Sequence, residues 1–195
     1  MKHAYIILVL AILALAVSCQ PEKVKVEEVT ENTATSLENS NTLRVIDTGK
    51  VSELVPTGWV NDYDKIFTAD EAKKLHKLID DFEKETTVEI AVVTLDTSMV
   101  GAEMTDLYAA TFALANKWGV GKKGKNNGIL IGIAKGWEQM YIQNAEGIEM
   151  VLSDEQTQQI VDTVFLPNYA QGDFYKGTND GLLTIMKHLK KSNVK

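Results

Sequence analysis

The sequence predicts an α/β fold: a three-layer α/β/α sandwich in which helices cover both faces of a small mixed β-sheet. Segments 88–95 and 128–134 are almost continuously apolar and rich in β-branched residues, which is typical of strands buried on both faces. Helical patterns lie before, between and after these segments. This alternation is typical of a sheet enclosed between two layers of helices.

The first helix is expected to begin after Thr68, because Thr68 and Glu71 have the spacing of a capping box. Apolar residues then recur at helical spacing as far as Phe82. Between the two apolar strands lies a second helical pattern that ends at Trp118, before a glycine. Because a helix crosses over between them, the two strands are expected to be parallel.

The second half of the domain is expected to start with a hairpin. Residues 135–138 would form its turn and lead into a third strand over 139–143, antiparallel to the strand before it. A second capping box at Ser153 opens another helix. We expect Pro167 to break that helix, because proline lacks the backbone N–H that a helix interior uses. A last helix is expected from about Asp173.

The N-terminus has the features of a bacterial lipoprotein signal peptide over residues 1–18. Lys2 gives a basic start, an apolar run follows, and Cys19 occupies the position that such a signal lipidates. The mature protein would then begin at Cys19 and be held at a membrane of the cell envelope by acyl chains, with the outer membrane favoured because Gln20 rather than aspartate follows. Ordinary secretion with an incidental cysteine is the alternative.

Residues 19–57 are expected to be a disordered tether between the lipid and a folded domain. They are rich in Glu, Thr, Asn and Ser and contain few large apolar residues. Such a segment cannot bury enough surface to offset its ordering entropy. Within it, residues 43–55 are mildly apolar and could dock on the domain, which we expect over residues 58–191.

Composition and motif context exclude several classes of function. A formal net charge of −7 argues against nucleic acid as a partner. Cys19 is the only cysteine, so none remains for a disulfide, a thiolate metal site or a nucleophile. Residues 119–124 spell G-x-G-x-x-G, but a phosphate loop must follow a strand and open a helix. Here the order is reversed, so we expect no nucleotide.

Oxygen-bearing side chains are expected to gather at one edge of the sheet. Two asparagines precede strand 128–134, and three acidic residues follow the strand that returns to the same edge: Asn126, Asn127, Glu146, Glu149 and Asp154. Hard oxygen donors of this kind suit calcium. Ordinary structural roles are also open to them, since asparagine is typical of tight turns and aspartate of helix N-termini.

Several motifs, in order along the chain, resemble the TPM domain family: VNDY at 60–63, the strand VEIAVVTL, WGVGKKGKNNG at 118–128, GIE at 147–149 and GDF at 172–174. The resemblance covers residues 57–191. This family includes thylakoid-lumen proteins of photosystem II repair and YgcG-like bacterial proteins anchored to membranes. It implies an α/β/α sandwich, in agreement with the order of elements.

The resemblance also implies binding of a divalent cation, notably calcium, and acid phosphatase activity in some members. Carried over by motif, the candidate ligands are Asp62, Asn127, Glu149 and Asp154. Asn126 and Glu146 are local variants, because family members usually have aspartate at the first position and glycine-rich sequence around the second.

Together these features predict a lipid-anchored accessory protein outside the cytoplasm that binds calcium and a membrane-protein partner. A metal-assisted acid phosphatase is one alternative, in which a bound cation activates water against a phosphate ester. In that case Lys122, Lys123 and Lys125 would hold the phosphate. A purely structural interaction domain with no ligand is another alternative.

Overall fold

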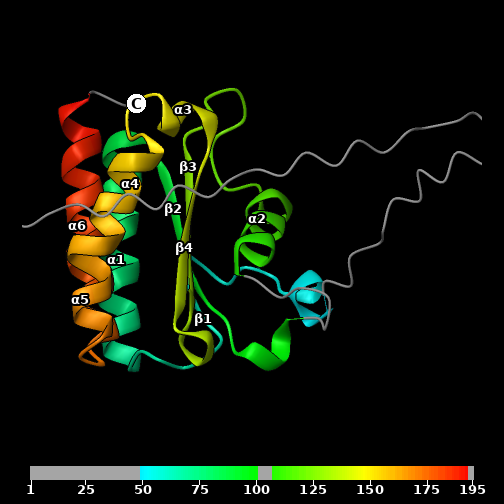
Figure 1. The fold of residues 1–195 in the computed structure, drawn as a ribbon. Coiled ribbons are helices and arrows are strands. Elements are labelled where there is room, and N and C mark those ends of the chain that lie inside the picture. Colours follow the sequence, from blue (N-terminus) through cyan, green and yellow to red (C-terminus); the bar gives the residue numbers. More distant parts are fainter. Residues whose placement is uncertain (1–48, 101–106, 193–195) are drawn as a thin grey trace, which may run out of the picture. The chain divides into compact units, whose positions relative to one another are not determined.

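The computed structural model describes residues 49–100 and 107–192. Four strands form one sheet in the order β1-β2-β3-β4 (Figure 1). The first three strands are parallel and β4 runs antiparallel to β3, as the sequence predicted for the central pair and the hairpin. The strands span Val60–Asp62 (β1), Glu89–Thr94 (β2), Gly128–Ala134 (β3) and Gln139–Asn144 (β4).

Helices cover both faces of the sheet, which confirms the predicted three-layer α/β/α fold (Figure 1). One face carries α2, and the other carries α1, α4, α5 and α6 (Figure 1). The helices span Ala69–Thr86 (α1), Leu107–Trp118 (α2), Glu146–Glu149 (α3), Asp154–Ile160 (α4), Leu166–Tyr169 (α5) and Phe174–Lys191 (α6). Short 3₁₀ helices span Gly49–Glu53 (η1), Thr97–Met99 (η2) and Lys135–Trp137 (η3).

Strand β2 shows why the central strands are apolar throughout. Ile90 and Val92 pack into the core beneath α1 and α6, whereas Ala91 and Val93 pack into the core beneath α2. Successive side chains of a strand point to opposite faces, and here both faces are covered. Alternation of polar and apolar residues would therefore have placed polar groups in one of the two cores.

Both predicted capping boxes are present and begin their helices where expected. At α1, the Thr68 amide donates to the Glu71 carboxylate at 2.8 Å and the Glu71 amide donates to the Thr68 hydroxyl at 3.3 Å. Ser153 and Gln156 form the same pair of bonds at α4. These local sequence signals fix the ends of helices that flank the sheet.

The expectation that Pro167 breaks its helix is wrong. The chain runs from α4 through a π-helix, Val161–Phe165 (η4), directly into α5. In the wide π turn the Leu166 amide donates to the Val161 carbonyl, five residues back. Pro167 then lies in the first turn of α5, where a missing N–H is tolerated. Two short elements, β1 and α3, were not predicted.

Residues 49–54, which fall within the expected tether, pack on the domain. Val51 of η1 is completely buried in the core beneath α2. The Trp118 indole N–H and the Lys117 ammonium each donate to the Leu54 carbonyl at 3.0 Å. The predicted signal peptide, Cys19 and the predicted tether as far as residue 48 lie outside the described residues. In the described part of the chain, no helix is long and apolar enough to cross a membrane.

Candidate functional site

Asn126 and Glu146 meet at the sheet edge where β3 begins and β4 ends, as expected. The Asn126 side-chain amide donates to the Glu146 carboxylate at 3.4 Å, and the Asn126 carbonyl accepts a bond from the Gly147 amide at 2.9 Å. A Cβ atom at Gly147 would lie 2.5 Å from the Lys125 carbonyl oxygen, so this close approach requires glycine. The contacts join the 119–127 loop to α3.

Asn127 is buried, and both ends of its side chain have partners within the protein. Its Oδ1 accepts a bond from the Lys122 amide at 2.9 Å, and its Nδ2 donates to the Thr87 carbonyl at 2.9 Å. These bonds hold the loop before β3 against the end of α1. Asn127 therefore has a structural role as a clamp of the loop.

Asp62 lies at the opposite edge of the sheet from the other candidates. It is the last residue of β1 and is paired in register with Thr94, the last residue of the parallel strand β2. Its carboxylate accepts bonds from the Thr94 hydroxyl at 2.6 Å and from the amides of Ile66 and Phe67 at 3.1 and 3.0 Å. The placement of Asp62 with the asparagines and Glu149 is thus corrected: this side chain shapes the turn before α1.

Two further carboxylates lie near Asp62 at that edge. Burial raises the pKa of Asp64 above its ordinary value, and the negative charge of Asp96 raises it further. Asp96 caps η2 by accepting a bond from the Ser98 amide at 2.8 Å. Bonds to the Ser98 hydroxyl and amide lower the pKa of Asp96.

The lysine-rich loop over 122–125 makes contacts within the protein that would compete with the binding of phosphate. The Lys122 ammonium lies 2.8 Å from the Glu83 carboxylate and 2.8 Å from the Glu89 carboxylate. Hydrogen bonds to these two groups raise the pKa of Lys122 above its ordinary value. Lys125 donates to the Thr87 hydroxyl at 2.9 Å. Two of the three lysines expected to hold phosphate therefore tie the loop to α1 and β2.

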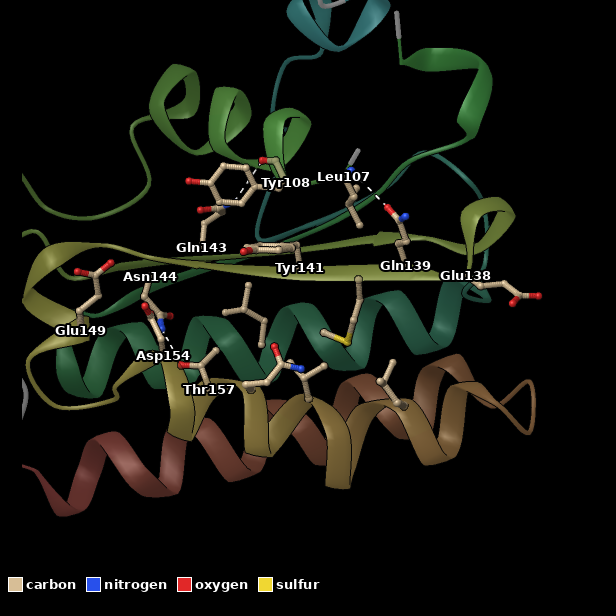
Figure 2. A pocket seen from close by; sticks show the side chains of 15 residues that line it. Leu107, Tyr108, Glu138, Gln139, Tyr141, Gln143, Asn144, Glu149, Asp154 and Thr157 are labelled. Atoms are coloured by element: carbon tan, nitrogen blue, oxygen red, sulfur yellow. Dashed lines mark hydrogen bonds between the residues drawn. The ribbon is translucent and has the colours of Figure 1, made fainter. Parts of the chain in front are cut away.

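Glu149 and Asp154 line a groove of about 740 Å³ that follows β4 between α2 and the α4–α5 segment (Figure 2). Among the described residues that line the groove, three carry a carboxylate and none is Lys, Arg or His. Glu149 and Asp154 lie at one end, which we call the acidic end, and Glu138 lies at the other (Figure 2). The groove is thus a negatively charged feature alongside an edge strand.

Asn144 is a residue of the acidic end that the sequence analysis did not identify. Asn144 is the last residue of β4 and lines the groove at this end (Figure 2). Its Nδ2 donates to the Thr157 hydroxyl at 2.8 Å, whereas its buried Oδ1 has no hydrogen-bond partner among the residues that the structure describes. Leaving a buried acceptor unpaired costs about 1–3 kcal/mol. A cation or an external donor at this point would remove that cost.

The donor types at the acidic end are those that hard cations take. They are the carboxylates of Glu149 and Asp154 and the amide oxygen of Asn144. Calcium takes carboxylates, amide oxygens and water together. Within residues 49–100 and 107–192, no group of three or more His, Cys, Asp or Glu side chains is arranged to hold a metal. Any cation here would therefore rely on the amide oxygen and on water.

Aromatic side chains form the middle of the groove (Figure 2). The rings of Tyr108 and Tyr141 meet edge to face, with centroids 4.9 Å apart. Both side chains are partly exposed, at 46% and 41%. The Gln143 side chain donates to the Thr111 hydroxyl at 3.0 Å and so fastens β4 to α2. The groove therefore has an aromatic wall next to β4, the edge strand of the sheet that the described residues form.

A protein family and two solved structures are similar to this chain. Residues 60–188 match the family model of the TPM domain. A solution structure of the N-terminal domain of a protein from P. gingivalis is similar, with a TM-score of 0.61 and 25% identity over 75% of this chain and 90% of that chain. BA42 from the psychrophilic bacterium Bizionia argentinensis is also similar, with a TM-score of 0.56 and 26% identity over 66% and 85%. No curated protein matches the chain.

Proposed function

The chain belongs to the TPM domain family, and on that premise we propose that it is a lipid-anchored accessory protein of the cell envelope that binds calcium and a membrane-protein partner. The observation that carries the proposal is the buried Oδ1 of Asn144, which has no hydrogen-bond partner among the described residues and belongs to a groove also lined by the carboxylates of Glu149 and Asp154. Glu149, Asp154 and Asn144 would hold the ion. Bound calcium would supply positive charge that offsets the negative charge of these carboxylates.

Calcium titration of the purified full-length protein by calorimetry tests the cation site. We expect a dissociation constant of about 0.1–1 mM, the range of extracellular calcium modules. In the double variant Glu149→Gln, Asp154→Asn the affinity should fall more than about tenfold, because both charged donors are replaced by neutral amides.

Glu146→Gln is the matched control for that titration. Glu146 lies at the same sheet edge but bonds Asn126 and does not line the groove. Its affinity for calcium should therefore equal that of the wild type. A protein that binds no calcium at several millimolar, or a Glu146→Gln variant as weak as the double variant, would contradict the site.

The anchor is tested by replacing Cys19, the residue that the signal pattern marks for lipidation. In bacteria fed a labelled fatty acid, the wild-type protein should carry the label and sediment with membranes. Cys19→Ser should lose the label, because a thioether-linked lipid at this residue is its expected attachment. An unlabelled wild-type protein in the soluble fraction would refute the anchor.

A metal-assisted acid phosphatase is one alternative, and the contacts of the lysine-rich loop give it less support. Lys122 is paired with Glu83 and Glu89, and Lys125 is bonded to Thr87. The groove lining among the described residues includes no cationic side chain that could hold a phosphate. Hydrolysis of a phosphate ester that stops on chelation and in the Glu149→Gln, Asp154→Asn variant would favour the phosphatase.

A further inference from the structure

Strand β4 directs toward the groove backbone groups that pair with no other described strand. The Ala145 amide donates to the Gly128 carbonyl at 2.9 Å, which sets the phase of the antiparallel ladder. Hydrogen-bonded pairs alternate along such a ladder, so Gln139, Tyr141 and Gln143 point their N–H and C=O groups toward β3. The remaining residues, Met140, Ile142 and Asn144, direct theirs outward. In the part of the chain that the structure describes, β4 pairs with no strand except β3.

This edge lacks the usual protection against strand pairing. Edge strands are commonly blunted by lysine, proline, a bulge or very short length. The β4 segment QMYIQN contains neither lysine nor proline, and all six of its residues pair with β3 in unbroken register. The groove between α2 and α4 follows this edge along its whole length (Figure 2). The edge is thus six residues long, carries no charged side chain of its own and borders the groove.

We propose that β4 binds an extended segment of a partner protein by β-strand addition, and that this segment carries a basic residue near each end. The backbone groups of Met140, Ile142 and Asn144 would supply the hydrogen bonds. The basic residues would meet Glu138 at one end and Glu149 with Asp154 at the other. At a rise of about 3.3 Å per residue, the segment between the two charges would be about 20 Å long.

The walls of the groove define the side chains between those charges. On the α2 side, Tyr108 and Tyr141 offer partly exposed rings. On the opposite side, Val161 and Leu166 line the groove. Alternate residues of an added strand face these two walls. Apolar or aromatic residues in the middle of the segment are therefore the best match.

Charge argues against a second copy of this chain as the occupant. Two grooves whose described lining residues carry only carboxylates as charged side chains would repel each other. A cationic segment gains attraction where a second copy meets repulsion.

Strand addition rests on the proposed function, because it describes how the partner is recognised. It also has a regulatory consequence. Calcium and a basic residue of the segment would use the same carboxylates, Glu149 and Asp154. Occupation by one removes the attraction for the other, and this coupling is reciprocal. Saturating calcium should therefore weaken binding of the segment about three- to fivefold, the size of an exposed ion pair.

The probe is the synthetic peptide acetyl-Lys-Val-Thr-Phe-Thr-Val-Lys-amide, titrated into the full-length protein in the presence of a chelator. In amide hydrogen exchange, its binding should slow exchange at Met140, Ile142 and Asn144. The amides of Gln139, Tyr141 and Gln143 are already bonded to β3 and should change little. In an added strand, every second peptide amide bonds to β4. N-methylation of that set should weaken binding more than about tenfold, whereas N-methylation of the other set should not.

Two protein variants and a reversed-charge peptide complete the test. Met140→Pro removes an outward N–H without removing a bond to β3, so it should abolish binding yet keep the fold. The peptide with glutamate in place of lysine should not bind the wild type, and Glu138→Gln should weaken the lysine peptide about threefold. Equal loss on methylation of both peptide edges, or equal binding of the glutamate peptide, would overturn the proposal.

The results separate this inference from the proposed function. Calcium binding without peptide binding in the chelator would overturn strand addition and leave the cation site intact. Peptide binding without any calcium binding would overturn the cation site and leave strand addition intact. A free protein that is already dimeric, with slow exchange at Met140 and Ile142, would identify a second copy as the occupant and overturn the proposed partner.

Discussion

Replacing Asp62 by alanine should lower the free energy of unfolding by about 3 kcal/mol, because it removes three hydrogen bonds to a charged acceptor. The Thr94 hydroxyl and the amides of Ile66 and Phe67 donate those bonds, and Thr94 is completely buried. Chemical denaturation measures the loss as a shift of the midpoint. Calcium affinity should remain that of the wild type, since Asp62 lies at the opposite sheet edge from Glu149.

Thr94→Val provides the matched partner for this experiment. It keeps the shape of the side chain and removes the hydroxyl that bonds Asp62. Because the two residues are in contact, the double variant should be more stable than the sum of the single losses predicts, by about 1 kcal/mol or more. An Asp62→Ala protein of normal stability that binds calcium weakly would contradict the structural role and make Asp62 a ligand.

Asp62 also illustrates what the sequence could not predict. Motif resemblance grouped it with Glu149 and Asp154, but resemblance gives no position in space. The short strand β1 places Asp62 at the end of a parallel pair with β2, whereas Asn126 precedes β3. Parallel strands carry these two positions to opposite edges of the sheet. Only three residues form β1, too few for the alternation that identifies a strand.

The predictions that succeeded depend on local signals. Thr68 with Glu71 and Ser153 with Gln156 fix their helix starts through bonds within four residues. The buried strands follow from continuous apolar sequence, and the hairpin brings Glu146 back to Asn126. These features need no knowledge of distant packing.

Asn144 was missed because its significance is not local. In sequence it is one polar residue at the end of a strand. Its importance arises because its Nδ2 donates to the Thr157 hydroxyl, from α4, whereas no described group donates to its Oδ1. Such a group is visible only once the helix and the strand have been packed together.

Gly181→Ala in α6 should also lower the free energy of unfolding by about 3 kcal/mol, at the upper end of overpacking in cores. A Cβ atom at Gly181 would lie 2.0 Å from the ring of Phe165, and Phe165 is completely buried. In an exposed helix the same change stabilises by about 1 kcal/mol, so the sign of the effect identifies the close contact. Thermal or urea unfolding measures it.

The same contact should link the core to the groove. Phe165 ends the π-helix, and Val161 and Leu166, on either side of it in the same segment, line the groove. Displacement of Phe165 by a new methyl group should therefore weaken binding of the lysine peptide at the edge of β4. Calcium binding should persist while the protein is folded, because Asn144, Glu149 and Asp154 all precede the π-helix.

The double variant Gly181→Ala, Phe165→Leu should recover part of the stability, since the smaller side chain makes room for the methyl group. If the double variant loses the full sum of both single effects, the clash is not the cause.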